Sequence, residues 1–374
     1  MLKVAIVGSG KIADDHASQI QRIKGCEIVG VCDSEPLMAR QFCERFPVKQ
    51  HFSDVHELLS EMRPDVVHVC TPPQSHFGIA KVCLEAGCHV YVEKPFALSE
   101  NDTRALIDFA NDRGLQITAG HDDQFRHAAR RMRSLVQRGY LGGSPVHMES
   151  YYCYELSDVS YAGAVLGDKR HWVRGLPGRL LHNIISHGIA RIAEFLATDS
   201  PKVIARGFVS PFLKKMGESE VVDELRVIIH EEEGATAYFT FSSQMRPSLH
   251  QFCLYGPRNG IMLDQDQETV IKLPGKRLKS YAEKFVAPVQ LAGQYLTNVK
   301  ANLGAFVRND FHMKSGMKYL IESFYHSIRD GAPTPIPYSE ILLTARIMDE
   351  IFAQLGHQQP SQPCHPNLEV VPVH

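Results

Sequence analysis

The first third of the chain alternates short apolar runs with amphipathic helical patterns, and this alternation limits the possible folds more than any other feature. The runs are rich in Val and Ile, as expected for strands that helices cover on both faces. They lie at 2–7, 26–32, 66–70, 89–92 and 116–119, with helical patterns near 11–23, 35–45, 76–86 and 100–112. Strands that alternate with helices form right-handed βαβ units around a parallel sheet. We therefore expect an α/β domain over residues 1–122.

After Gly120 the pattern changes to longer strand-like runs that follow one another more directly. These runs lie at 146–154, 202–209, 221–230, 235–242 and 250–255, with helical patterns at 124–138, 314–329 and 339–355. A turn containing Gly234 between two of the runs predicts a hairpin. Residues 123–357 should form an α+β domain around an open, mostly antiparallel sheet, and residues 358–374 a loosely ordered tail.

Composition argues against several classes of protein. The formal charge is −2 over 374 residues, so no overall basic field favours nucleic acid. The first apolar run follows Met1 directly, which leaves no room for a secretory leader, and no run reaches the roughly 20 residues of a membrane helix. The nine cysteines include no Cys-x-x-Cys pair, so they favour neither a disulfide framework nor a zinc site. We expect a soluble, cytoplasmic protein.

A glycine-rich turn joins the first strand to the first helix. The stretch Gly8-Ser9-Gly10-Lys11-Ile12-Ala13 fits the G-x-G-x-x-G/A pattern of Rossmann dinucleotide-binding domains. Gly8 permits the tight turn, Gly10 lets the backbone approach a pyrophosphate, and Ala13 lets the helix pack closely on the sheet. Glycines also mark ordinary turns, but here the strand–turn–helix context is present. We predict cofactor contacts from Gly8, Ser9, Gly10, Lys11 and Ile12.

Asp33 ends the second strand, about 20 residues beyond the glycines, where an acid can bond both ribose hydroxyls of a dinucleotide. A carboxylate there also repels a 2′-phosphate. Since Asp33 precedes a helical pattern, it could instead be a helix N-cap. We predict NAD as the cofactor, in preference to NADP.

Two further segments follow predicted strands, at the carboxyl ends where such sheets bind ligands. Thr71-Pro72-Pro73 would hold an extended turn beside the nicotinamide, with His76 nearby, although the prolines alone favour a rigid loop. Glu93-Lys94-Pro95 places an amine where hydride transfer needs a proton donor or acceptor. Burial and neighbours tune the pKa of a lysine, and Glu93 could orient Lys94. The tripeptide alone would favour a surface ion pair.

Together, the glycine loop, the Thr71-Pro72-Pro73 turn, the Glu93-Lys94-Pro95 tripeptide and the later antiparallel half resemble the Gfo/Idh/MocA family. That family contains glucose–fructose oxidoreductases, inositol dehydrogenases and related sugar dehydrogenases. The resemblance covers roughly residues 1–270 and the closing helices. It implies that Lys94 is the catalytic lysine, with a cis bond before Pro95. It also implies that the outer face of the second sheet forms a homo-oligomer (dimer or tetramer) and that its inner edge holds the substrate.

The family usually carries an Asp-x-x-x-His pattern on a helix of the second domain, and the matching stretch here runs from Asn183 to His187. His187 matches the family's proton carrier, and imidazole titrates near neutral pH. Asn183 replaces the aspartate; its amide can bond a substrate hydroxyl but cannot exchange a proton with it. At this spacing on one helix, both side chains should face the same way. Without the resemblance, His187 would be interpreted as a satisfied helix histidine.

Weaker candidates for substrate contact lie in predicted loops. Arg126 follows the last strand of the first domain, where relatives often contact substrate, and Trp172 and Arg174 precede the Asn183–His187 stretch. An arginine there could bind a carboxylate or a phosphate, whereas surface packing accounts for all three about as well. His121-Asp122-Asp123 could suggest a metal, but consecutive residues rarely converge on one ion. We predict no metal.

Residues 276–312 form an unusual segment. Apolar residues recur there at helical spacing, and basic residues surround them: Tyr281, Phe285, Val289, Ala292, Leu296, Val299, Leu303 and Phe306, with Lys276, Arg277, Lys279, Lys284, Lys300 and Arg308. The plainer interpretation is an amphipathic helix, kinked at Pro288 or Gly293, that packs on its own domain or a subunit neighbour. The alternative is an interfacial helix, over about 281–308, that docks on a membrane or a membrane-bound partner.

Three functions remain open. The preferred one is an NAD-dependent dehydrogenase or reductase of a sugar, nucleotide sugar or cyclitol, in which Lys94 and His187 handle the proton. Substrate contacts would come from Lys94, Arg126, Trp172, Arg174, Asn183 and His187, and cofactor contacts also from Thr71, Pro72, His76, Glu93 and Lys94. A non-catalytic NAD-binding sensor or scaffold, and a lyase or glycosidase that oxidises its substrate transiently, are the alternatives.

Overall fold

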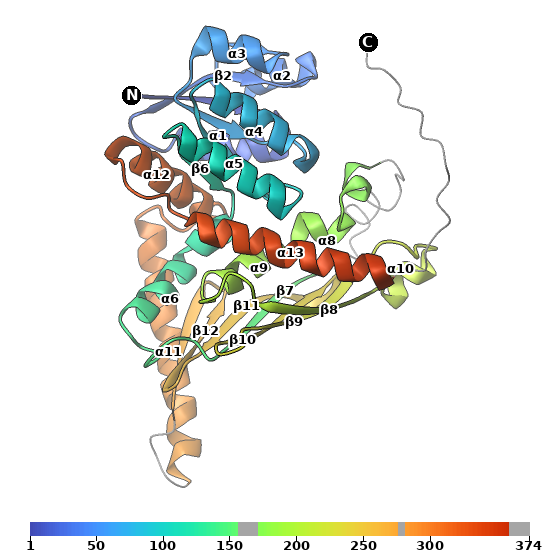
Figure 1. Ribbon diagram of the computed structural model, residues 1–374. Helices are drawn as coiled ribbons and strands as arrows, with labels where there is room; N and C mark the ends of the chain where they lie inside the picture. The colour runs from blue at the N-terminus through green and yellow to red at the C-terminus, as the bar shows by residue number, and fades with distance from the viewer. Residues whose placement is uncertain (156–170, 276–280, 359–374) are drawn as a thin grey trace.

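A computed structural model describes residues 1–155, 171–275 and 281–358, and it contains two domains that are each built on one sheet (Figure 1). Helix α13, Tyr338–Gln358, runs along the junction, where it contacts α5 of the first domain and both α9 and β8 of the second. The predicted tail lies almost wholly outside the described residues.

The first domain is a parallel sheet of six strands in the order β3-β2-β1-β4-β5-β6. Helices cover both of its faces, which confirms the Rossmann-type fold. Its elements are β1 Leu2–Val7, α1 Lys11–Ile20, β2 Cys26–Cys32, α2 Pro36–Arg45, β3 His51–Phe52, α3 Val55–Met62, β4 Val66–Val69, η1 Pro73–Ser75, α4 His76–Glu85, β5 His89–Val92, α5 Glu100–Asp112 and β6 Ile117–Ala119.

The central strands of this sheet are buried on both sides, as their unbroken apolar runs predict. Val4 and Ile6 of β1, Val67 of β4 and Val90 of β5 are fully buried. The core does not end with the first domain's own sequence, because helix α12, Ser315–Asp330, completes it. Leu320, Ile321, Phe324 and Tyr325 of α12 all belong to this core. A helix from the far end of the chain therefore adds to the unit predicted over residues 1–122.

The second domain is built on a seven-stranded sheet in the order β13-β12-β11-β7-β10-β9-β8. Only β7 and β10 pair in parallel, so the open, mostly antiparallel sheet is confirmed. The predicted hairpin is also confirmed, as β9 and β10. Its elements are η2 Asp122–Phe125, α6 His127–Gln137, β7 His147–Glu155, η3 Trp172–Gly175, α8 Arg179–Ile184, α9 Ser186–Ala193, β8 Lys202–Phe208, α10 Pro211–Lys215, β9 Glu224–His230, β10 Thr236–Ser242, β11 Gln244–Tyr255, β12 Asn259–Asp264, β13 Thr269–Pro274 and α11 Ala282–Val307.

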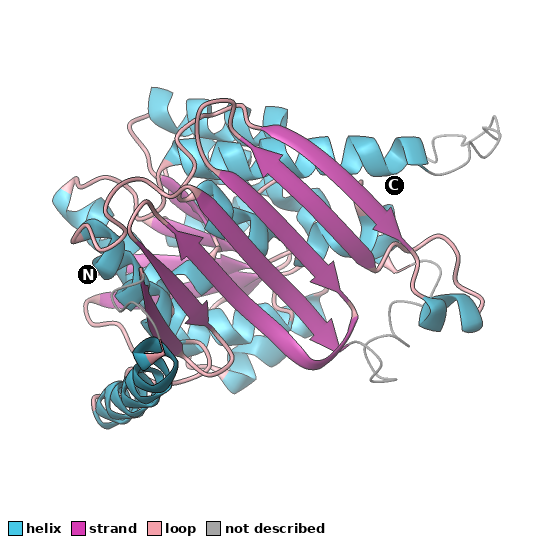
Figure 2. Cartoon of the chain, turned by 90° about the horizontal axis from the view of Figure 1, so that it is seen from below, coloured by secondary structure: helices cyan, strands magenta, loops and turns pink. Residues whose placement is uncertain are grey.

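Helices pack on one face of the second sheet, and among the described residues the other face is bare (Figure 2). On the bare face, Ile204 of β8, Ile228 of β9 and Tyr238 of β10 lie directly opposite one another across neighbouring strands. Their side chains remain 43–56% exposed. This apolar row suits the oligomer contact that the resemblance implies, which stays a prediction.

Helix α11 extends past the edge of the second sheet (Figure 1). It is a continuous helix of 26 residues in spite of Pro288. Among the described residues, no helix is long and apolar enough to cross a membrane.

Candidate active site

A cleft of about 880 Å³ opens at the carboxyl ends of strands β1, β2, β4 and β5. This is the edge at which a doubly wound sheet binds ligands. Of the predicted cofactor residues, all but His76 line the cleft: Gly8, Ser9, Gly10, Lys11, Ile12, Asp33, Thr71, Pro72, Glu93 and Lys94. Trp172 and Asn183 close it from the second domain.

The glycine turn is shaped by two different requirements. Gly8 has φ +92°, and a Cβ there would lie 2.7 Å from the carbonyl carbon of Cys70, so no larger residue fits between β1 and β4. Gly10 is the N-cap of α1 and supplies no side-chain cap. A Cβ on Gly10 would meet nothing within 4 Å, so its small size leaves open space at the N-terminus of the helix. That space suits a pyrophosphate approaching free N–H groups.

Asp33 has both a structural role and a place in the cleft. Its Oδ2 accepts hydrogen bonds from the backbone N–H and the hydroxyl of Ser9, each at 2.7 Å, and its Oδ1 accepts from the N–H of Glu35 at 3.0 Å. The N-cap of α2 is Glu35 rather than Asp33. Asp54 contributes a second carboxylate to this part of the cleft, and no arginine lines the cleft within the described residues.

Glu93 is held by a chain of buried polar side chains. Its Oε1 lies 2.8 Å from Nε2 of His16, the two Nδ1 atoms of His16 and His68 lie 2.7 Å apart, and Nε2 of His68 lies 2.7 Å from the hydroxyl of Tyr325. Donation from Tyr325 to His68, from His68 to His16 and from His16 to Glu93 gives each of these hydrogen bonds one donor and one acceptor. Burial opposes ionisation of Glu93, but the hydrogen bond from His16 outweighs it and lowers the pKa of Glu93 to about 2.

Lys94 reaches across the cleft to the second domain. Its Nζ donates to the backbone carbonyl oxygen of Asn183 at 2.9 Å, and the Lys94–Pro95 peptide bond is cis, as the resemblance implies. Glu93 accepts from the backbone N–H of Lys94 at 3.2 Å, so it fixes the loop rather than the ammonium group. Burial lowers the pKa of Lys94, and Glu93 opposes that shift. The alternative of a surface ion pair does not describe this lysine.

His76 lies between the Glu93-Lys94-Pro95 loop and the Thr71-Pro72-Pro73 turn. Its Nδ1 lies 2.9 Å from the carbonyl oxygen of Pro95 and its Nε2 lies 2.8 Å from that of Thr71. It is buried and does not line the cleft. Its contacts join the two loops that flank the cofactor cleft.

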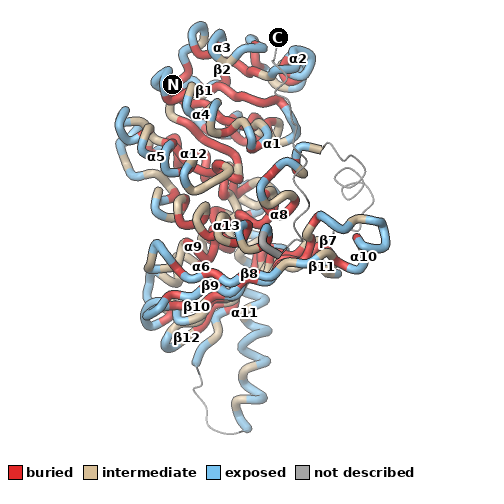
Figure 3. The backbone as a smooth tube through the Cα atoms, turned by 45° about the vertical axis from the view of Figure 1, so that its right-hand side comes forward, coloured by how far each residue is buried: buried red, intermediate tan, exposed pale blue. Residues whose placement is uncertain are grey.

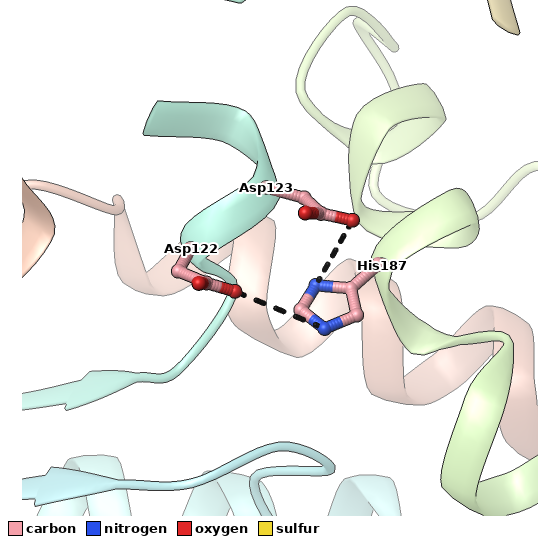
Figure 4. A group of neighbouring side chains, drawn as sticks. All are labelled: Asp122, Asp123 and His187. Atoms are coloured by element: carbon pink, nitrogen blue, oxygen red, sulfur yellow. Dashed lines mark ion pairs between the residues drawn. The ribbon is translucent and has the colours of Figure 1, made fainter. Parts of the chain in front are cut away.

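His187 lies between two carboxylates (Figure 4). Its Nε2 is 3.9 Å from Oδ1 of Asp122, and its Nδ1 is 3.9 Å from Oδ2 of Asp123. Both distances exceed a hydrogen bond, and Nδ1 of the buried imidazole has no hydrogen-bond partner. The alternative reading of His187 as a satisfied helix histidine therefore does not hold.

The two carboxyl groups beside His187 differ in their electrostatic surroundings. Burial, with the negative charges of Asp123 and Glu93, raises the pKa of Asp122 to about 7. Burial also acts on Asp123, but His187 and Arg191 outweigh it and hold its pKa below the ordinary value. Burial lowers the pKa of His187 to about 4, against the pull of Asp123. At neutral pH the imidazole is therefore neutral, and Asp122 titrates.

Asp123 is fixed by groups of its own. The hydroxyl of Tyr152 donates to its Oδ2 at 2.9 Å, and Nη2 of Arg191 lies 3.4 Å from the same atom. Atoms of Asp122, Asp123 and His187 lie within 4.8 Å of one another, so adjacency in sequence did not prevent these side chains from converging. The cationic Arg191 and the buried Lys94 nearby disfavour a divalent ion at this place. The absence of a metal stays a prediction.

Asn183 and His187 do not lie on one helix. The helix is interrupted at Ile185, which separates α8 from α9. Asn183 lines the cofactor cleft, whereas His187 is not among the residues that line it and lies against Asp122 and Asp123. The expectation that both side chains share one face rested on an unbroken helix and is wrong in that respect.

The three weaker candidates have different surroundings. Trp172 lines the cleft, and its carbonyl oxygen accepts from Nε2 of Gln74 at 2.9 Å. Arg126 pairs with Glu268 at 2.6 Å, and Arg174 pairs with Glu218 at 2.7 Å. Neither arginine lines the cleft, and each is paired with a carboxylate outside it.

Sequence reasoning missed the carboxylates that flank His187. Asp122 and Asp123 were considered only as metal ligands, yet they begin η2 directly after β6. Ligands bind at the carboxyl ends of parallel strands, and this rule applies to the end of β6 as well as to the ends of β4 and β5. Tyr152 and Arg191 carried no comparable signal.

Comparisons with known proteins agree with the fold of this chain. Residues 2–121 match the profile of the GFO_IDH_MocA family, described as an oxidoreductase family with an NAD-binding Rossmann fold. D-glucoside 3-dehydrogenase of Escherichia coli is 35% identical over 142 residues, which are 38% of this chain and 40% of that enzyme. Myo-inositol 2-dehydrogenase of Thermotoga maritima is 24% identical over 84% of this chain and 89% of its own length.

Solved structures of the same fold extend the match to nearly the whole chain. The WlbA dehydrogenase of Bordetella pertussis, solved in complex with NADH and UDP-GlcNAcA, superposes with a TM-score of 0.76. The superposition covers 96% of each chain at 14% sequence identity. At this identity the likeness establishes the fold of both domains.

Proposed function

Since the chain belongs, through its N-terminal domain, to the Gfo/Idh/MocA oxidoreductases, we propose that it is an NAD-dependent dehydrogenase or reductase of a sugar, nucleotide sugar or cyclitol. One observation carries the proposal: Lys94 lines the cofactor cleft and bonds the segment that leads to His187 and its two carboxylates. The proposal therefore treats the cofactor cleft and the proton-handling groups beside it as one site. The named enzymes that the chain resembles act on glucosides and on inositol, which supports the substrate class.

The cleft has the features that a dinucleotide requires. The open space at Gly10 and the N-terminus of α1 suits the pyrophosphate, and Asp33 suits the ribose hydroxyls. NAD, when bound, supplies the hydride acceptor or donor. The two carboxylates of the cleft, Asp33 and Asp54, support NAD over NADP.

The chain's own groups would handle the proton and the charge on oxygen. In the oxidative direction, the substrate carbon loses a hydride to the cofactor and its hydroxyl loses a proton, which leaves a ketone. Neutral His187 accepts that proton, and the Lys94 ammonium stabilises negative charge as it develops on the oxygen. Ionised Asp122 then stabilises the imidazolium that forms.

Asp122 takes over the function of the carboxylate that the family pattern places four residues before the histidine. Asn183 occupies that position and cannot accept a proton. Asp122 reaches the same imidazole from η2, at 3.9 Å from Nε2. The exchange of aspartate for asparagine is therefore compatible with catalysis, and the sensor hypothesis loses its main support.

The test is a screen of sugars, nucleotide sugars and cyclitols with the purified chain and NAD, followed by NADH fluorescence and product analysis. The proposal expects NADH and an oxidised product in equal amounts, and none with Lys94→Ala. A changed product without net NADH would indicate a lyase or glycosidase. NAD binding without any turnover across the panel would favour the sensor.

A further inference from the structure

The N-terminal half of α11 stands free of the protein body. Figures 1 and 3 show it projecting beyond the sheet as a largely exposed helix. Phe285 is 74% exposed and Val289 is 71% exposed. No charged residue occurs between Lys284 and Lys300. The plainer expectation named packing on its own domain or on a subunit neighbour; the first is wrong for this half, and the second stays a prediction.

The other half of α11 is fixed to the edge strand β13. The side-chain amide of Asn298 bonds both the N–H and the carbonyl oxygen of Val270, at 2.9 and 3.0 Å. Gln294 does the same with Lys272, at 2.7 and 2.9 Å. These amides satisfy backbone groups that an edge strand otherwise leaves open. The projecting half is thus held in one place by a rigid base.

A basic hollow lies at that base, between α6, β13 and α11. Its volume is about 730 Å³, and Arg131, Arg138 and Lys272 line it without any carboxylate. None of these three cations forms an ion pair with a described residue, and Nη1 of Arg131 is buried without a hydrogen-bond partner. The hollow therefore presents positive charge that the part of the chain described by the structure leaves unbalanced.

Burial lowers the pKa of Arg131, and the acidic residue that raises it, Glu268, is not free to pair with this arginine. Glu268 acts on Arg131 electrostatically, but its Oε1 lies 2.6 Å from Nε of Arg126 and its Oε2 accepts from the N–H of Ala128 at 2.8 Å. Both oxygens of that carboxylate are engaged elsewhere.

The hollow and the apolar surface of α11 are contiguous. Gly293 lines the hollow, and Val289 and Leu296 lie four residues before and three residues after it. Residues at these spacings are neighbours on a helix surface. A ligand with an acidic group in the hollow can therefore place an apolar part against Val289 and Leu296.

We propose that this hollow and the exposed apolar surface of α11 together bind anionic phospholipid at a bilayer surface. The headgroup phosphate would pair with Arg131, Arg138 and Lys272, and the acyl region would cover Phe285, Val289 and Leu296. The proposal does not depend on the enzymatic function.

A bilayer explains the exposure better than a second copy of the chain does. Val286 and Leu291 are also exposed, each 38%, and they lie on opposite flanks of the row formed by Phe285 and Val289. A fluid phase covers apolar residues on several sides of one helix, whereas a single protein surface covers one side. The unbalanced cations add a requirement for negative charge that a second copy, with the same basic hollow, does not meet.

Flotation of the full-length protein with vesicles tests the proposal. We expect binding to phosphatidylcholine vesicles that contain phosphatidylglycerol, and little binding to phosphatidylcholine alone. Each of Arg131→Gln, Arg138→Gln and Lys272→Gln should weaken binding about fivefold, and Val289→Asn with Leu296→Asn should abolish it. Lys214→Gln with Lys215→Gln, in the short helix α10, removes two other cations as a matched control and should change nothing.

Three outcomes would overturn the proposal. The first is no binding to either vesicle, and the second is equal binding to both. The third is a dimer, seen by sedimentation, that Val289→Asn with Leu296→Asn dissociates while vesicle binding is absent. Unchanged NAD binding and thermal unfolding of each variant exclude loss of the fold as the cause of an effect.

Discussion

The Lys94 ammonium donates a hydrogen bond to the main-chain carbonyl oxygen of Asn183, at 2.9 Å. Because the acceptor belongs to the backbone, the contact survives any side chain at position 183. The residue that departs most from the family pattern therefore still positions Lys94, the proposed catalytic lysine. The side chain of Asn183 supplies no carboxylate near His187, and Asp122 does.

Lys94→Ala should retain NAD binding and lose turnover by roughly a hundredfold to ten-thousandfold. The ammonium group contacts the second domain, while the glycine turn and Asp33 remain as they are. Steady-state kinetics and an NAD titration measure the two effects separately. Near-normal turnover would remove Lys94 from the mechanism.

His187→Ala should nearly abolish turnover, whereas Asn183→Ala should raise KM or lower kcat only modestly. His187 is the group between the carboxylates, and Asn183 keeps its main-chain bond to Lys94 in the variant. The comparison needs kcat and KM for both variants with the same substrate. Equal, small effects at both positions would place the proton carrier on another residue.

Asp122 should control the pH dependence of the oxidation. Its pKa is raised to about 7, so the ionised form that stabilises an imidazolium appears as the pH rises through 7. In the wild type, kcat/KM should rise over that range, and Asp122→Asn should flatten the rise and slow the reaction by about a hundredfold.

A control separates Asp122 from a general effect of charge. Asp199→Asn removes an exposed carboxylate of the second domain and should leave the profile unchanged. If the rise persists in Asp122→Asn, another group titrates there.

Asp33→Ser should narrow the preference for NAD over NADP by roughly tenfold, equivalent to about 1.4 kcal/mol. The substitution removes the carboxylate that repels a 2′-phosphate and accepts from Ser9. Calorimetric titration of wild type and variant with both cofactors gives the ratio. Tighter binding of NADP by the wild type would contradict the assignment.

Glu340→Gln should stabilise the protein at alkaline pH. Burial and the neighbouring Glu194 raise the pKa of Glu340 to about 8, so the folded protein holds a proton that the unfolded chain releases near pH 4.5. The stabilisation that this proton gives is complete below pH 4.5 and is lost as the pH rises toward 8. Each pKa unit of difference corresponds to about 1.4 kcal/mol.

The measurement is Tm against pH for both proteins. The wild type should lose more stability than Glu340→Gln between pH 5 and pH 8, because glutamine does not titrate. The variant keeps its hydrogen bond, since the glutamine oxygen can still accept from Nε2 of Gln124. Parallel curves would show that Glu340 does not titrate in this range.

Local patterns in the sequence predicted most of the fold, because strand and helix periodicities repeat within a few residues. Two elements of the first domain, β3 and α3, were missed. With two residues, His51 and Phe52, β3 is too short to show a period. Helix α3 had a readable signal, since Asp54 caps it through the N–H groups of His56 and Glu57.

The cofactor site could be predicted because its parts follow strands in order along the chain. The proton-handling site could not be predicted as fully, because His187 meets Asp122 across 65 positions of sequence, from different elements. The family pattern identified the histidine, but only the fold brings η2 beside α9. No residue around Ile185 indicates a break between α8 and α9, since all of them are compatible with one continuous helix.

Tyr325, in helix α12, is the last member of the row of buried hydrogen bonds that begins at Glu93. That row is complete only after α12 has been synthesised. A ribosome releases residues 1–122 long before α12 exists, so His68 and the apolar surface beneath that helix lack their cover until residues 315–330 have been made. A fragment cut at residue 122 would be left in the same state. The cofactor-binding half is therefore translated first but completes its core only when α12 has been made.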